Sequence, residues 1–215
     1  MAPFPLSTVS LYPAPVAQRR HHYESAFERL LRDRRIPYVA VDEARKALLP
    51  DGAPPRLATG TRQAQSLKSF DFVLYGDGSN LLAEVKGRRY VSPRSRPGPG
   101  RLESWVNVED VDSLLTWQRL FGPEFAAAFV FVYWCVEQPP DGLFEDVFEH
   151  RGRWYALRAV LVEDYARLMR VRSRRWGTVH LDGASFNRIS RPFASRAGLW
   201  AAPEAPAFEP LGVVA

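Results

Sequence analysis

The chain has 215 residues, of which 46% are hydrophobic and 25% are charged, and these ordinary globular values exclude wholesale disorder. Its formal net charge of +5 is compatible with a polyanionic partner but does not by itself indicate one. A single cysteine, Cys135, excludes an internal disulfide. Its place in the apolar run 126–136 indicates a buried, unreactive thiol, and we expect a cytoplasmic protein.

The two ends of the chain differ in composition from the middle. Residues 1–19 and 196–215 are rich in Pro and Ala and have little periodicity, so we expect both to be tails of a single domain at 20–195. Prolines interrupt the apolar N-terminus, which is not typical of a signal peptide. The longest apolar runs have about ten residues, too few to cross a bilayer, so we expect no membrane-spanning segment.

The middle of the chain alternates between helical and strand patterns. Apolar residues at helical spacing predict helices over about residues 20–34, 108–121 and 163–170. Runs of β-branched and aromatic residues predict strands over residues 36–41, 68–75, 80–86, 127–136, 144–150, 154–162 and 178–181. The strand over 127–136 is apolar throughout, which is typical of a central strand. This order predicts an α/β fold with a mixed sheet flanked by helices.

The second and third of these strands are joined by Gly-Asp-Gly-Ser, which predicts an antiparallel hairpin. The register that pairs the residues flanking this turn places Asp71 directly opposite Glu84. Because side chains alternate along a strand, Asp71, Glu84 and Lys86 are expected to share one face. Lys68, three residues before Asp71, is expected to face away and is assigned no catalytic role. The other face is expected to be apolar throughout: Phe70, Phe72, Leu74, Leu81, Ala83 and Val85.

The polar face of this hairpin carries the chemistry. Two carboxylates that face each other across neighbouring strands, about 5 Å apart, repel unless a cation lies between them. Carboxylate oxygens suit a hard divalent cation, so Asp71 and Glu84 predict a site for Mg²⁺ or Mn²⁺. Lys86 can orient a metal-bound water and stabilise the charge of a transition state. The alternative is a solvated face with an ion pair between Glu84 and Lys86.

The pattern Asp71…Glu84-Val85-Lys86 resembles the core motif of the PD-(D/E)xK nuclease superfamily, in which Asp, a spacer and Glu-x-Lys lie on a hairpin. The resemblance implies a restriction-endonuclease-like core, to which the strands from residue 144 onward are an addition. It also implies hydrolysis of DNA phosphodiester bonds with Mg²⁺ or Mn²⁺. The chain departs from the motif in one position, because Phe70 rather than proline precedes Asp71.

The resemblance also implies roles for residues outside the hairpin. A glutamate on the preceding helix, matched by Glu24 with Glu28 as the alternative, would complete the coordination of a metal held by the hairpin carboxylates. The following helix often carries an inward polar residue in the Holliday-junction-resolvase and RecB-like branches. Gln118 fits that position, where it would orient Lys86 or a phosphate, and Glu109 with Asp110 suit the positive end of the helix dipole. Candidate phosphate contacts follow the hairpin: Arg88, Arg89, Arg94 and Arg96.

Other interpretations of the sequence stay open. The segment His22-Tyr-Glu-Ser-Ala-Phe-Glu28 resembles an uncharacterised bacterial family named for its HYExAFE motif, over about residues 20–190. The fold could serve as an inert nucleic-acid-binding or scaffolding module without turnover. A protein that shares only the hairpin would be favoured if Asp71 and Glu84 lay on opposite faces. A homodimer is one option for the oligomeric state.

Overall fold

The computed structural model describes residues 16–41, 67–76, 80–90, 102–136 and 146–193, and side chains from residue 22 onward. The predicted arginine contacts at 94 and 96 and most of both expected tails lie outside these ranges. The first helix, α1 (Val16–Asp33), begins four residues earlier than the sequence predicted, so residues 16–19 are helical and not part of a tail. No helix in the described ranges is long and apolar enough to cross a membrane.

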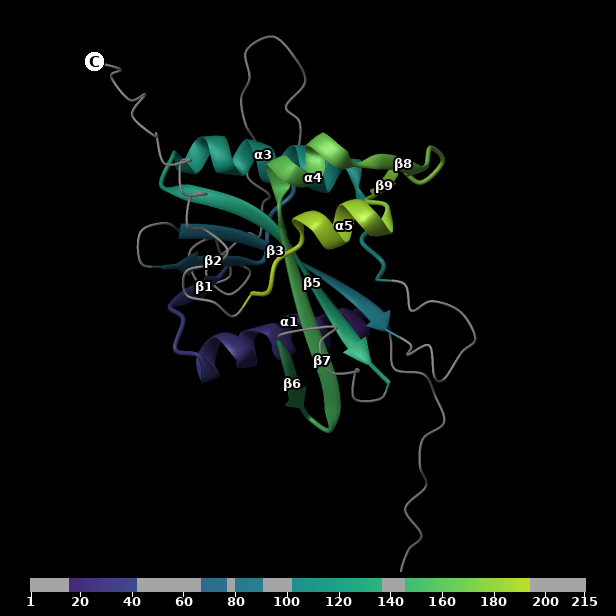
Figure 1. The fold of residues 1–215 in the computed structure, drawn as a ribbon. Helices are drawn as coiled ribbons and strands as arrows, with labels where there is room; N and C mark the ends of the chain where they lie inside the picture. The colour runs from purple at the N-terminus through teal and green to yellow at the C-terminus, as the bar shows by residue number, and fades with distance from the viewer. Residues whose placement is uncertain (1–15, 42–66, 77–79, 91–101, 137–145, 194–215) are drawn as a thin grey trace, which may run out of the picture.

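A six-stranded mixed sheet forms the centre of the fold (Figure 1). In spatial order its strands are β1 (Tyr38–Ala40), β2 (Phe72–Tyr75), β3 (Asn80–Tyr90), β5 (Phe125–Cys135), β7 (Arg153–Leu161) and β6 (Val147–His150). β3 and β5 run parallel along their whole length, whereas the other neighbours are antiparallel. Because β5 is nearly all buried and lies between β3 and β7, its prediction as a central strand is confirmed.

Helices cover both faces of this sheet (Figure 1). The helix α1 packs on one face, and α3 (Val108–Phe121) with α4 (Val162–Leu168) packs on the other. Alternate residues of β5 therefore enter different cores: Phe129 and Phe131 lie with α3 and α4, and Val130 lies with α1. The prediction of an α/β fold with a mixed sheet flanked by helices is confirmed.

The hairpin of β2 and β3 has apolar residues on both faces, which corrects the sequence-based assignment of a single core face. Phe72, Leu74, Leu81, Ala83 and Val85 pack against α1 as expected. However, Val73 and Leu82 on the opposite face are buried against α3. Phe70 also belongs to that second core, because regular β2 begins only at Phe72 and side-chain alternation does not extend back to residue 70.

A second, three-stranded sheet was not predicted as such. It contains β4 (Val106–Asn107), β9 (Thr178–His180) and β8 (Arg170–Ser173), and α5 (Gly183–Ile189) follows it. The expected strand at 178–181 is present but joins this sheet and not the main one. β4 leads directly into α3 and pairs with β9, so this sheet holds the first turn of α3 in place. β4, β8 and α5 are too short to give a clear periodicity in the sequence.

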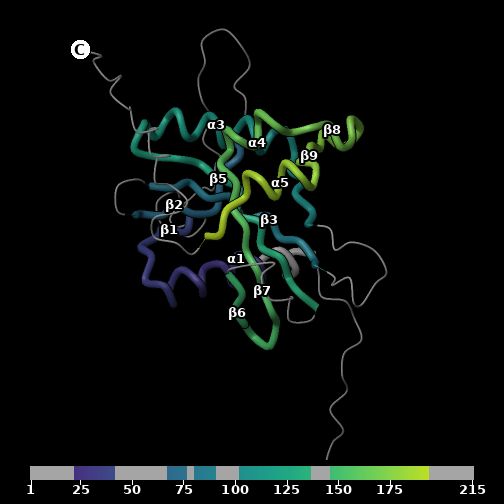
Figure 2. The backbone as a smooth tube through the Cα atoms, in the orientation of Figure 1, coloured from purple at the N-terminus to yellow at the C-terminus, as the bar shows by residue number. Residues whose placement is uncertain are grey.

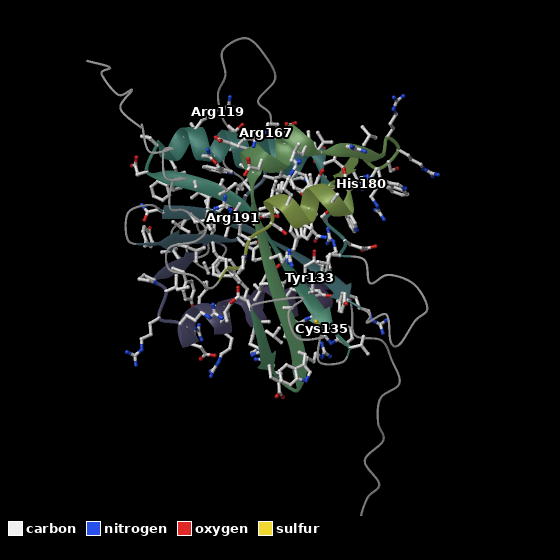
Figure 3. All side chains as sticks on the ribbon, in the orientation of Figure 1. Arg119, Tyr133, Cys135, Arg167, His180 and Arg191 are labelled. Carbon is white, nitrogen blue, oxygen red and sulfur yellow. The ribbon has the colours of Figure 1, made fainter. Side chains whose placement is uncertain are left out.

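Defined residues mark several turns and helix ends. Asn107 occupies the N-cap position of α3, and Gly122 ends that helix with a φ of 98°. The β6–β7 hairpin turns at Arg151 and Gly152, and it extends to the side of the molecule opposite α3 and α4 (Figure 2). Cys135 is buried at the end of β5 (Figure 3), and burial raises the pKa of its thiol to about 12, as expected of an unreactive cysteine.

Candidate active site

Asp71 lies opposite Glu84, as the hairpin register predicted. The ladder between β2 and β3 pairs Tyr75 with Asn80 and ends at Phe72 and Ala83. One residue beyond that pair, the backbone N–H of Asp71 donates to the carbonyl of Ala83 at 3.1 Å. The carboxylate of Asp71 accepts a 2.7 Å hydrogen bond from the N–H of Val85, which fixes its direction.

These two carboxylates face a cleft of about 590 Å³ between α1, β3 and the start of α3. Asp71, Glu84 and Lys86 all line it, Lys86 contacts Glu84, and the charges of Glu84 and Lys86 act on Asp71, so the prediction that they share one face is confirmed. The charged residues of the cleft come from four segments of the chain: Glu24, Lys68, Asp71, Glu84, Lys86, Arg88 and Asp110. The helix α3 covers the same face of the sheet further along, where Val73 and Leu82 are buried, and the cleft opens where that cover ends.

The carboxylates of Glu24, Asp71 and Glu84 repel one another. Burial raises the pKa of Asp71 well above its ordinary value, and the charges of Glu84 and Glu24 raise it further. Burial also raises the pKa of Glu84, against the opposing effect of Lys86, and the charges of Asp110 and Glu24 add to the increase. The ionised cluster is therefore unfavourable unless a positive charge enters the cleft.

Lys86 is held between two carboxylates. Its Nζ lies 2.8 Å from Glu84 Oε1 and 2.7 Å from Asp110 Oδ2, and its side chain is only 16% exposed. Burial disfavours the charged form, but Glu84 and Asp110 outweigh burial and hold the pKa of Lys86 above its ordinary value. Lys86 therefore remains an ammonium, and its contacts with Glu84 on β3 and Asp110 on α3 together fix its direction.

Asp110 is a site residue that the sequence analysis missed. It lies in the first turn of α3, where its charge suits the helix dipole, and this ordinary explanation concealed its contact with Lys86. Burial disfavours its charge, yet Lys86 and Lys68 together hold the pKa of Asp110 below its ordinary value. The only sequence signal for it was an acid at the start of the helix that follows Glu-x-Lys.

Gln118 does not reach the cleft, which corrects its predicted role. Its Oε1 accepts a hydrogen bond from the N–H of Ala127 at 2.9 Å, and its Nε2 donates to Glu163 at 2.6 Å. These contacts join α3 to β5 and α4, two turns beyond the cleft. The sequence predicted correctly that Gln118 lies on the inward side of α3. It did not predict that the first turn of this helix, and not the turn with Gln118, faces the cleft. Asp110 makes the contact with Lys86 that was assigned to Gln118.

Lys68 lines the cleft, contrary to the prediction that it faces away from Asp71. That prediction assumed strand alternation from residue 68, whereas β2 begins at Phe72. The segment before β2 lies against α3, and Lys68 Nζ contacts Asp110 Oδ1 and Glu109 Oε2, both at 3.0 Å. The two lysines of the cleft thus contact opposite oxygens of the same carboxylate.

The helix α1 brings Glu24 to the cleft and directs Glu28 elsewhere. Glu24 lines the cleft and raises the pKa values of both hairpin carboxylates by its charge. Glu28 accepts hydrogen bonds from Arg32 at 2.6 Å and from Tyr38 at 2.7 Å. Of the two glutamates considered from the sequence, only Glu24 is placed to approach a ligand of Asp71 and Glu84.

Arg88 and Arg89, both candidate phosphate contacts, have different surroundings, and burial of Arg88 argues against that role for it. Arg88 is 8% exposed, its guanidinium donates to the carbonyls of Gly87 and Trp105, and it stacks 3.9 Å from the centre of the Trp105 ring. Although Arg88 lines the cleft, its guanidinium is used in these internal contacts. Arg89 points to the other face of β3, where it is exposed and lies 5.4 Å from the ring of Trp134.

The chemistry of the donor set fits a hard cation. Among the described residues, no three His, Cys, Asp or Glu side chains are close enough together to form a complete metal site. Mg²⁺ commonly binds through one or two carboxylates and keeps several waters. Asp71 and Glu84 could supply those carboxylates, with Glu24 within electrostatic range, and a cation there would relieve the repulsion that raises their pKa values.

No family model matches this chain, and no curated protein matches it. Among solved structures, it is similar to Hjc of Archaeoglobus fulgidus, a Holliday junction resolvase from an archaeal hyperthermophile. The sequence identity is 15% and the TM-score is 0.43, over 84% of this chain and 96% of that chain. A likeness of this degree carries no argument about function, which has to come from the residues of the cleft.

Tyr23 packs directly on the backbone of Gly87, and this contact holds α1 next to the cleft. A Cβ added at Gly87 would lie 2.1 Å from Cδ2 of Tyr23. We expect Gly87→Ala to displace Tyr23 and the adjacent Glu24, with a loss of about 1–3 kcal/mol in the free energy of unfolding, as overpacking usually causes. Mn²⁺ affinity, measured by calorimetry, should fall with it.

Gly183→Ala is the matched control, because a Cβ at Gly183 meets no atom within 4 Å. Adding Tyr23→Ala to Gly87→Ala should remove the clash, so the two substitutions should be strongly non-additive in thermal denaturation. Additive losses would show that Tyr23 and Gly87 are not coupled.

Proposed function

We propose that this chain is a metal-dependent nuclease that hydrolyses DNA phosphodiester bonds and has a restriction-endonuclease-like core. The observation that carries the proposal is the meeting of Asp71, Glu84 and Lys86 in one cleft, in the order and spacing of the PD-(D/E)xK motif. DNA as the substrate class comes from that resemblance. The mixed sheet with helices on both faces is compatible with the proposal.

In this proposal Asp71 and Glu84 hold Mg²⁺ or Mn²⁺, and Glu24 contributes directly or through a water. The bound ion would supply a Lewis acid and lower the pKa of an attacking water. Asp71 is oriented by the N–H of Val85, so its other carboxylate oxygen can be directed to the cation at little cost in side-chain entropy.

Lys86 stabilises the negative charge that grows on the phosphoryl oxygens during attack. A preorganised cation contributes most when its position is set before the reaction, since no reorganisation is then needed. Asp110 provides that position: when Glu84 turns to a cation, the ammonium of Lys86 keeps its 2.7 Å contact with Asp110. Asp110 is thus a positioning residue that acts through Lys86.

A second candidate function is an inert nucleic-acid-binding or scaffolding module. It is favoured by the 2.8 Å contact between Lys86 and Glu84, which uses one oxygen of a carboxylate that the nuclease needs for its cation. A protein that shares only the hairpin is disfavoured, because Asp71 and Glu84 line the same cleft.

Incubation of the purified chain with supercoiled plasmid and with single-stranded DNA tests the proposal. We expect cleavage with Mn²⁺ or Mg²⁺ that EDTA abolishes and that Asp71→Asn lacks, which excludes a contaminating nuclease. DNA binding with no cleavage in either metal would favour the inert module. If the chain neither binds nor cleaves DNA, both functions are contradicted.

A further inference from the structure

Four contacts hold Lys68 against α3. Its backbone N–H donates to Ser113 Oγ at 3.3 Å, and its carbonyl accepts a 2.7 Å hydrogen bond from Trp117 Nε1. Its ammonium contacts Glu109 and Asp110, both at 3.0 Å. The residue therefore has a defined position at the edge of the cleft, although it lies outside regular secondary structure.

The ammonium of Lys68 is accessible from the cleft. Its side chain is 42% exposed, compared with 16% for Lys86. An ammonium has three N–H donors, and the contacts with Glu109 and Asp110 use two of them. The third can reach a ligand oxygen without the loss of either ion pair.

A polyanionic substrate needs accessible positive charge in this cleft. Four of the lining residues are acids, and the guanidinium of Arg88 is used in contacts with Gly87 and Trp105. Lys86 is largely buried beside the carboxylates. Among the described cleft residues, Lys68 is therefore the cation best placed to meet the phosphate backbone of a strand as it enters.

The residue type at position 68 also suits contact with a phosphate. Only three of the 29 basic residues in the chain are lysines, and two of them, Lys68 and Lys86, contact the same carboxylate. A lysine presents a compact point charge with donors that can turn, whereas the planar arginine fork needs more room. Because Glu109 is 77% exposed, its ion pair with Lys68 contributes little to stability.

We propose that Lys68 binds a backbone phosphate of the nucleic-acid substrate, next to the phosphate at the hairpin carboxylates. This inference rests on the proposed function and adds a second cationic subsite to it. Asp110 links the two subsites, since it holds Lys86 by Oδ2 and Lys68 by Oδ1. Two successive phosphates of one strand would each meet a lysine placed by that carboxylate.

Three variants test the subsite by DNA binding over a series of salt concentrations, with Ca²⁺ and with EDTA. Lys68→Gln should weaken binding about five- to tenfold and reduce the slope of log K against log salt by about one, the value for one lost phosphate contact. Glu109→Gln should leave binding equal or tighter, because it removes a negative charge beside the subsite. Arg119→Gln removes the same charge from an exposed position of α3 (Figure 3) and should leave the slope unchanged.

Lys68→Gln is expected to weaken DNA binding, whereas Glu109→Gln is not. This difference distinguishes a phosphate subsite from a structural ion pair. If the pairs are only structural, Lys68→Gln should lower the melting temperature, Glu109→Gln should change it little, and both variants should have the same salt slope as Arg119→Gln. That result overturns the subsite.

The cleavage assay of the parent chain separates this inference from the proposed function. If DNA binding depends on Lys68 but the parent chain does not cleave DNA, the nuclease function is contradicted and the phosphate subsite is supported. Cleavage that Lys68→Gln leaves unchanged in both KM and kcat would retain the nuclease and contradict the subsite. A parent chain without affinity for DNA overturns both.

Discussion

Asp71→Asn and Glu84→Gln should each abolish both Mn²⁺ binding and cleavage, whereas Lys86→Ala should slow cleavage and leave Mn²⁺ binding in place. The two carboxylates are acceptors suited to a hard cation, while an ammonium has no lone pair with which to bind one. Lys86→Ala should lower the cleavage rate by about 10²–10³, the effect of losing one positioned electrostatic group. Its Mn²⁺ affinity should stay equal or increase, because a nearby positive charge is removed.

Thermal stability without metal gives an independent measurement on the same variants. Because the pKa of Asp71 is raised in the folded chain, its ionisation costs stability as the pH rises through that pKa. Asp71→Asn removes this cost and can still accept the hydrogen bond from Val85, so its melting temperature at neutral pH should exceed that of the parent. Lys86→Ala should melt lower, since Glu84 and Asp110 lose their cation.

Calorimetric Mn²⁺ titration beside a plasmid nicking assay checks these outcomes. Cleavage by Lys86→Ala at the parent rate would refute the role of this lysine, even if the metal site is correct. Equal Mn²⁺ binding by all three variants and the parent would show that the hairpin face holds no cation, and the binding-module function would then be preferred.

Asp110→Asn should lower kcat about 10²-fold and leave Mn²⁺ affinity nearly unchanged. The loss follows because an Asn amide cannot hold the ammonium of Lys86 as a carboxylate does, and misplacement of a catalytic group by about 1 Å is enough for such an effect. KM should change much less than kcat. Asp112→Asn, the same substitution at an exposed position of the same helix, is the matched control and should keep the parent rate.

The pH profile distinguishes positioning by Asp110 from a structural role. Asp110 is one of two carboxylates that hold the pKa of Lys86 above its ordinary value. A cationic Lys86 is lost as pH rises through that pKa, so the basic limb of the kcat profile should move to lower pH in Asp110→Asn. If the basic limb of the kcat profile does not move in Asp110→Asn and the melting temperature falls, Asp110 only stabilises α3.

The hairpin was predictable because its rules are local. Only four residues separate the paired Tyr75 and Asn80, so this short connection sets the register and places Asp71 opposite Glu84 without reference to the rest of the chain. The same holds for the apolar strand β5, whose composition already required cover on both faces. The central part of the candidate site could therefore be predicted from the sequence.

Residues that come to the cleft from other elements depend on packing, and there the sequence was less informative. The apolar stripe predicted which side of α3 faces inward, so Gln118 was expected to be inside, but it did not predict which end of the helix reaches the site. Pairing of β4 with β9, more than 70 residues away in the chain, places the first turn of α3 at the cleft and so selects Asp110. The short strands involved leave almost no pattern in the sequence.

By itself, the sequence determined the facing carboxylates, the lysine two residues from Glu84, and the mixed sheet that supports them, because alternation and turn chemistry act over a few residues. Only the tertiary structure decided that Asp110 and Lys68 join this cluster and that the Arg88 guanidinium is used internally. Ion pairs between distant segments form where the packing of helices on the sheet brings the segments together, and side-chain period alone does not specify that packing.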